Sequence, residues 1–132
     1  MFHNLCGQYR CSIESGRLKL PAPLCRALKI ESKQQFHMTR EKSDRLHLYS
    51  QQLWEERVDE LMRLRKQHGG EEKFREIVDS YCPIDVDKNG RMTIPQDIRE
   101  RAGLDKKVVV VGMLDHMEIW DFEKYERSFR RM

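Results

Sequence analysis

The sequence lacks the features that mark membrane and secreted proteins. Its apolar residues never form a run approaching the roughly 18 that a membrane-spanning helix needs. Its first residues, Met1 to Gly7, show no basic start followed by a long apolar stretch, so we expect no secretory signal. These absences predict a cytoplasmic protein with no membrane partner.

Motifs for catalysis and for metal or cofactor binding are also missing. No CxxC pair occurs, and the histidines show no ligand spacing. There is no glycine loop that would cradle a phosphate, and no serine elbow. We therefore expect reduced thiols, no cofactor, no metal, no small-molecule substrate and no enzymatic activity. The possible metal ligands or nucleophiles among Cys and His are Cys6, Cys11, Cys25 and Cys82 with His3, His37, His47, His68 and His116.

The net charge of +3 is too small to indicate a nucleic-acid partner by itself. Its distribution along the chain is more informative. Residues 1–40 hold seven Lys and Arg against two acidic residues, whereas residues 41–80 hold eight against ten and residues 81–132 hold ten of each. The N-terminal part is therefore a basic patch, which fits an anionic partner, although a merely solvated face explains it equally well.

A short phrase occurs twice, 74 residues apart. The copies are Gly16-Arg17-Leu18-Lys19-Leu20-Pro21 and Gly90-Arg91-Met92-Thr93-Ile94-Pro95. Each copy contains a turn glycine, an arginine, a short alternating strand and a proline suited to the first turn of a helix. The recurrence of a whole supersecondary unit indicates a fold built by duplication.

Hydrophobic periodicity predicts similar elements in both halves. A first repeat over residues 7–50 and a second over 81–124 would flank a helical hairpin at 51–80, with a helical tail at 125–132. Strands are expected over 9–13, 17–20, 35–38, 46–49, 84–86, 91–94, 108–111 and 117–120. Helices are expected after Pro21 and over 51–68, 71–80, 95–102 and 122–131.

Together with the repeated phrase, several segments resemble the MraZ family, whose members carry two tandem SpoVT-AbrB repeats. The matching segments are Gly7 to Cys11, Leu46 to Tyr49, Asp87 to Pro95, Ala102 to Leu104 and Glu118 to Asp121. The resemblance implies an α+β fold, a pseudo-symmetric β-barrel made of two AbrB-like, swapped-hairpin repeats. It also implies a ring-shaped homo-oligomer at the nucleoid that regulates division and cell-wall genes by binding repeated elements of double-stranded DNA.

The family signature in each repeat is an acid followed four positions later by arginine. Asp87 and Arg91 keep this spacing, whereas Glu14 stands only three positions before Arg17. The first turn is therefore expected to be one residue shorter than the second.

The repeated arginines are the leading candidates for reading DNA. A guanidinium fork matches the O6 and N7 acceptors of guanine in the major groove, and a neighbouring carboxylate can hold the fork in place. Arg17 and Arg91 would read bases, with Asp87 and Glu14 as orienting acids. The flanking candidates for phosphate or base contacts are Arg10, Lys19, Lys88 and Asn89, for which a plain solvated surface is an equal alternative.

Two other interpretations stay open for these turns. Asp87 and Arg91 could simply pin the turn as a structural ion pair, in an AbrB-like, antitoxin-like module that binds another protein. The segment Asp85 to Gly90 also matches the opening of an EF-hand calcium loop, but the twelfth position is Gln96 and not the bidentate Glu. The strand-turn-strand pattern disfavours calcium.

Overall fold

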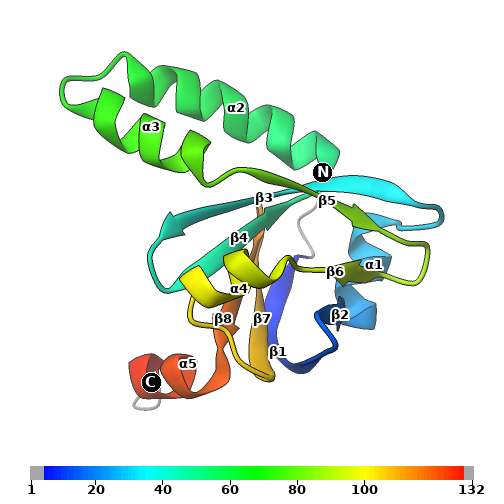
Figure 1. Cartoon of the computed structure of the whole chain (residues 1–132). Helices are drawn as coiled ribbons and strands as arrows, with labels where there is room; N and C mark the ends of the chain where they lie inside the picture. The colour runs from blue at the N-terminus through cyan, green and yellow to red at the C-terminus, as the bar shows by residue number, and fades with distance from the viewer. Residues whose placement is uncertain (1–4, 130–132) are drawn as a thin grey trace.

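A closed eight-stranded β-barrel forms the body of the protein in the computed structural model, which describes residues 5–129 (Figure 1). Five helices accompany it in this range, so the α+β barrel expected from the sequence is confirmed. The strands are β1 (Cys6–Glu14), β2 (Arg17–Lys19), β3 (Gln34–Lys42), β4 (Arg45–Tyr49), β5 (Cys82–Val86), β6 (Arg91–Thr93), β7 (Lys107–Met113) and β8 (Met117–Asp121). The helices are α1 (Ala22–Leu28), α2 (Gln51–Arg65), α3 (Gly70–Asp79), α4 (Gln96–Arg101) and α5 (Phe122–Phe129).

The order of strands around the barrel carries a pseudo-twofold symmetry. The order is β1-β2-β6-β5-β3-β4-β8-β7, with every pair antiparallel. Strand β1 of the first half pairs with β7 of the second, and β5 of the second half pairs with β3 of the first. Each half thus places its first hairpin in the other half's sheet. Two seams, β2–β6 and β4–β8, join strands that occupy equivalent places in the two halves.

Alternation along the strands fills the barrel interior with apolar side chains. In β2 and β6 the central residues Leu18 and Met92 are buried and their neighbours are exposed. In β7 the run Val108, Val109 and Val110 is buried throughout. Both faces of β7 are covered because α5 packs outside the barrel against β7 and β8.

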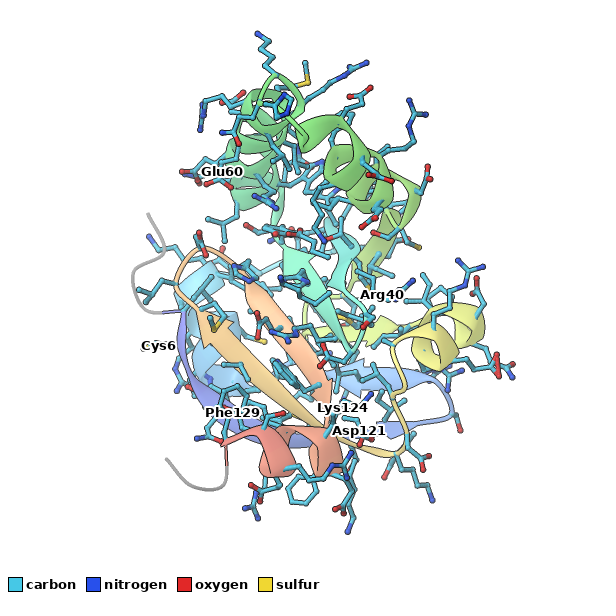
Figure 2. The ribbon with its side chains drawn as sticks, turned by 90° about the vertical axis from the view of Figure 1, so that its left-hand side faces the viewer. Cys6, Arg40, Glu60, Asp121, Lys124 and Phe129 are labelled. Carbon is cyan, nitrogen blue, oxygen red and sulfur yellow. The ribbon has the colours of Figure 1, made fainter. Side chains whose placement is uncertain are left out.

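The helical hairpin α2–α3 lies at one end of the barrel, and α5, with Lys124, lies at the other (Figure 2). Ser50 caps α2 by accepting a hydrogen bond from the N–H of Leu53. His37 of β3 stacks on Trp54 of α2, and Trp54 stacks on Tyr81 at the start of β5. These rings hold the hairpin against the barrel.

Helix α2 is shorter than its periodicity predicts, because it ends at Arg65 and not at residue 68. The N–H of Gly70 instead closes a turn onto the carbonyl of Gln67 and opens α3. Only a glycine fits there, since a Cβ at position 70 would lie 1.9 Å from the carbonyl oxygen of Leu64. Within residues 5–129, every helix is too short or too polar to cross a membrane.

Candidate nucleic-acid interface

The seam between β2 and β6 brings the two copies of the repeated phrase together. In its register Arg17 lies opposite Thr93, Leu18 opposite Met92 and Lys19 opposite Arg91. Leu18 and Met92 point into the core, so the other four side chains share the outer face, and all four are exposed. Arg17 and Arg91 are diagonal neighbours on this face, a relationship that places Cα atoms roughly 7–8 Å apart.

Reciprocal backbone bonds tie each turn to the opposite repeat. The N–H of Leu20 donates to the carbonyl of Gly90 at 2.8 Å, and the N–H of Ile94 donates to the carbonyl of Gly16 at 2.9 Å. The two turns therefore lie at opposite ends of one rigid ladder. Two arginines presented by such a ladder have a fixed spacing.

The first turn has only two residues, Ser15 and Gly16, between the paired residues Glu14 and Arg17. Both have positive φ, 52° and 79° respectively. This is the type I′ geometry that matches the twist of a two-residue hairpin.

The second turn has three residues, Lys88, Asn89 and Gly90, and its glycine has a φ of 81°. The N–H of Gly90 donates to the carbonyl of Asp87 at 3.0 Å, and the N–H of Asp87 donates to the carbonyl of Arg91 at 3.0 Å. The first turn is thus one residue shorter than the second, and the side chains of Lys88 and Asn89 stand exposed at the longer tip.

The acidic residues do not hold the guanidinium groups as the sequence suggested. Asp87 Oδ1 accepts hydrogen bonds from the backbone N–H groups of Asn89, at 2.8 Å, and Arg91, at 2.9 Å. These bonds lower the pKa of the Asp87 carboxyl, with the charges of Arg91 and Lys88 contributing further. Within residues 5–129 no ion pair joins Asp87 to Arg91, or Glu14 to Arg17. The Asp87 carboxylate therefore shapes the turn by accepting hydrogen bonds from the backbone N–H groups of Asn89 and Arg91.

Arg10 lies apart from the group at the seam. Its guanidinium forms an ion pair with Glu126 of α5 at 3.3 Å and stands 5.1 Å above the ring centre of Phe122. Position 10 is four residues along β1 from Glu14, which is about 13 Å of extended chain. The structure therefore brings together Arg17, Lys19 and Arg91, and leaves Arg10 on another face.

Two further side chains belong to this surface, and the sequence analysis did not select them. A depression on this surface is lined by four basic or hydroxyl side chains and two acids, which are Arg17, Lys33, Arg91, Thr93, Asp85 and Asp87. Lys33 pairs with Asp85 at 3.7 Å. The alternation Arg91-Met92-Thr93 would have shown that Thr93 shares the face of Arg91. Nothing in the sequence indicated that Lys33 lies on this surface. It precedes β3 and comes close to the seam only through the pairing of β3 with β5.

Comparison with known proteins places the chain in a family. A family described as "MraZ protein, putative antitoxin-like" matches residues 83–132. The transcriptional regulator MraZ of Treponema denticola is 30% identical over 129 residues, which cover 96% of this chain and 88% of that protein. The chain belongs to the MraZ family. The MraZ regulators of Christiangramia forsetii, 32% identical over 130 residues, and Acidobacterium capsulatum, 31% identical over 116 residues, are similar in the same way.

Membership of the MraZ family agrees with the barrel. The curated relatives are named transcriptional regulators, and they match this chain over most of its length. The family match at residues 83–132 begins at β5 and contains the second turn with Asp87 and Arg91.

Proposed function

We propose that this protein is a transcriptional regulator that binds specific double-stranded DNA through the outer face of the β2–β6 seam. Arg17 and Arg91 are the base-reading residues of this proposal, and Lys19, Lys88 and Asn89 contact the backbone or base edges. The protein would act in the cytoplasm, at the nucleoid, on repeated promoter elements.

The observation that carries the proposal is a pair of like charges held face to face. Lys19 and Arg91 are direct cross-strand neighbours, both exposed, and Arg17 lies diagonal to Arg91. Like charges opposite each other destabilise a sheet, by an amount of the order of 0.2–1 kcal/mol. The carboxylates of Asp87 and Asp85 lie beside this group and offset part of its charge, but among residues 5–129 neither forms an ion pair with Arg17 or Arg91. An anion such as DNA would relieve this repulsion.

We also propose that the protein acts as a homo-oligomeric ring. The net charge of +3 is small, and one seam offers few contacts, so a single copy is expected to bind weakly. Several copies of the seam on tandem DNA elements would add their contacts by avidity. Exposed apolar residues on the helical hairpin, Val58, Met62 and Val78, offer surface for contacts between copies.

Fluorescence anisotropy tests the proposal directly. A labelled duplex from upstream of the protein's own gene is compared with a scrambled duplex of equal length, at two salt concentrations. Tighter binding to the native duplex that weakens with salt supports DNA reading through phosphate-assisted contacts. Equal or absent binding to both duplexes rejects the proposal.

A second candidate function is an antitoxin-like protein-interaction module. The observation that favours it is the same exposed apolar group on α2 and α3, at 37% for Val58, 43% for Met62 and 48% for Val78. In that case the arginine seam would be structural. Two results together would favour this function. A partner protein would co-purify with the wild type and not with a Met62→Glu variant, and that variant would show no change in DNA binding.

A further inference from the structure

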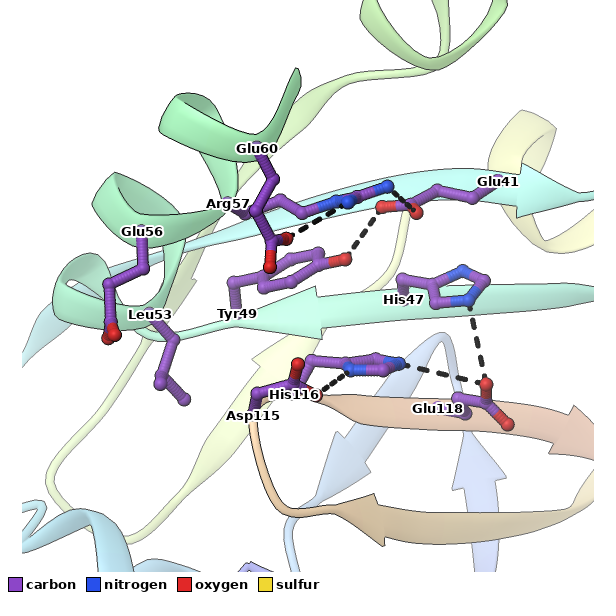
Figure 3. A pocket seen from close by; sticks show the side chains of 10 residues that line it. All are labelled: Glu41, His47, Tyr49, Leu53, Glu56, Arg57, Glu60, Asp115, His116 and Glu118. Atoms are coloured by element: carbon purple, nitrogen blue, oxygen red, sulfur yellow. Dashed lines mark hydrogen bonds and ion pairs between the residues drawn. The ribbon is translucent and has the colours of Figure 1, made fainter. Parts of the chain in front are cut away.

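The second seam, β4–β8, brings together three side chains that can act as metal ligands. His47 of β4 lies directly opposite Glu118 of β8, and His116 precedes β8 by one residue. Figure 3 shows both imidazole rings converging on the Glu118 carboxylate. Their candidate ligand atoms all lie within 4.8 Å of one another.

Two distances in this group are longer than ordinary N–H···O hydrogen bonds, which span about 2.7–3.2 Å, and leave room for a shared ion. His47 Nε2 lies 3.5 Å from Glu118 Oε2, and His116 Nε2 lies 3.7 Å from the same oxygen. Zinc binds imidazole nitrogen and carboxylate oxygen at about 2.0–2.2 Å, so neighbouring ligand atoms of a tetrahedral site are about 3.4 Å apart. The two histidine–glutamate distances are close to that spacing, and the candidate nitrogen atoms of the two histidines lie within 4.8 Å of each other.

Two ring nitrogens of this group are buried and find no hydrogen-bond partner among residues 5–129. They are His47 Nδ1 and His116 Nε2. The side chains of His47 and Glu118 are only 7% and 9% exposed. Buried polar atoms in folded proteins are nearly always paired, so an orphaned nitrogen aimed at a carboxylate needs an explanation. A cation between the three groups would explain the unpaired His116 Nε2.

The surroundings orient these groups as metal ligands are commonly oriented. Asp115 Oδ1 lies 2.7 Å from His116 Nδ1, the carboxylate–histidine arrangement that fixes a metal-binding imidazole. Trp120 Nε1 donates to Glu118 Oε1 at 2.8 Å, which leaves Oε2 facing the histidines. His47 lacks an outer partner, so we expect weaker binding than in a closed structural zinc site.

We propose that His47, His116 and Glu118 form a binding site for a divalent transition-metal ion of the zinc class. Two imidazoles and one carboxylate are ligands that such ions accept, with a fourth position open to water. That position would face a cavity of about 310 Å³ whose walls include Glu41, Tyr49 and Arg57. A bound ion would link β4 of the first repeat to β8 of the second, and so clamp the two halves together.

A cationic side chain of the protein, Arg45, competes with the ion for Glu118. Arg45 Nη1 lies 3.9 Å from Glu118 Oε2, while its guanidinium stacks on the Trp120 ring at 3.9 Å from the centre. The competing interpretation is a purely internal ion network of Arg45, the two histidines and Glu118. It predicts that added metal finds no preferred place at this seam.

Zinc titration of chelator-treated protein, followed by calorimetry, tests the proposal with the metal alone. We expect one ion per chain, with affinity reduced at least about tenfold in His47→Gln, His116→Gln and Glu118→Gln. His68→Ala is the matched control, because this exposed histidine in the α2–α3 connection should leave the affinity unchanged. Circular dichroism without metal identifies any variant that fails to fold. In that case Asp115→Asn tests the site instead, because it changes only the partner of His116 Nδ1 and should cause a smaller loss of affinity.

Cobalt absorption separates this site from the four free cysteines. Binding at the seam gives the visible bands of a tetrahedral nitrogen–oxygen site and no near-ultraviolet thiolate band. Unchanged zinc affinity in folded His116→Gln and Glu118→Gln proteins, or a thiolate band that follows the ion, would overturn the proposal. Wild-type protein that binds zinc no more tightly than the variants would also overturn the proposal.

Discussion

Leu18 and Met92 occupy the same place in the two repeats and lie directly opposite each other across the β2–β6 seam. Their side chains are 0% and 2% exposed, so the two halves of the barrel meet through this contact. The outer face of the same strands carries the arginines. Core packing at this seam and the spacing of the candidate DNA-reading residues therefore both depend on the six residues Arg17 to Lys19 and Arg91 to Thr93.

Shortening the core residues of this seam should destabilise the protein strongly. Leu18→Ala and Met92→Ala each remove a buried side chain and leave a cavity, with an expected loss of about 2–5 kcal/mol in the free energy of unfolding. Urea unfolding followed by circular dichroism measures this loss. Met113→Ala, at a residue 43% exposed at the end of β7, should cost far less. Equal losses at the three positions would contradict the placement of this core.

Removing either arginine of the seam should weaken DNA binding without affecting the fold. Arg17→Ala and Arg91→Ala each delete one exposed guanidinium, with an expected loss of about 1–3 kcal/mol per reading contact and a shallower salt dependence. Anisotropy with the native and scrambled duplexes measures both effects. Discrimination between the duplexes should fall, and the oligomer mass should stay the same.

Arg63→Ala is the matched control for the arginine variants, since it removes an equally exposed guanidinium from α2. Arg10→Ala is a second comparison, because Arg10 is paired with Glu126 of α5. If either of these lowers specific binding as much as Arg91→Ala does, the DNA-binding face lies elsewhere on the barrel.

The glycine of the second turn should tolerate no side chain. Gly90 has a φ of 81°, and an added Cβ would lie 2.5 Å from the Cys25 sulfur. Gly90→Ala combines backbone strain of about 1 kcal/mol with a clash of about 1–3 kcal/mol. Gly69→Ala provides the comparison, since its φ is 77° and its surroundings are open. Urea unfolding that shows equal losses for the two variants would show that the Cys25 contact does not matter.

The duplication of one unit was predictable from the repeated phrase, and the barrel from the resemblance to the MraZ family. The common face of Arg17, Lys19 and Arg91 was not predicted, because it depends on the pairing of β2 with β6. The role of Asp87 was not predicted either, since a carboxylate two to four residues before a backbone N–H can accept a hydrogen bond from that N–H or pair with a guanidinium. The expected ion pair with Arg91 is absent among residues 5–129, and Asp87 shapes the turn instead.

The second seam lay beyond sequence reasoning for a different reason. His47 and His116 are 69 residues apart, so no spacing motif joins them. Only the register of β4 against β8 places His47 opposite Glu118. The available signal was the correspondence between Leu46 to Tyr49 and Met117 to Trp120. When equivalent strands pair antiparallel across a pseudo-twofold axis, the residue on the axis faces its equivalent, as His47 faces Glu118.

The ion network beside that seam gives the stability a defined pH dependence. Burial raises the pKa of the Glu41 carboxyl, but hydrogen bonds from Tyr49 and Thr39 and the charges of His47 and Arg57 more than offset it, so the net pKa is lowered from 4.5. Figure 3 shows Tyr49 and Arg57 meeting this carboxylate, at 2.7 Å and 2.6 Å. A lowered folded-state pKa contributes stability above the unfolded value, and that stability is lost as the pH falls through the folded value.

Glu41→Gln should therefore destabilise the protein at pH 7, by about 1–3 kcal/mol, because Arg57 loses its buried charged partner. The difference from the wild type should begin to shrink as the pH falls below 4.5, because the carboxyl of the unfolded state takes up a proton there, and should disappear only below the lowered folded-state pKa. Urea unfolding at pH 7, 5 and 3.5 measures the difference. Glu72→Gln, at an exposed position of α3, should show little difference at any of these values. A Glu41→Gln deficit that stays constant across the range would mean that lost shape, and not lost charge, weakens the variant.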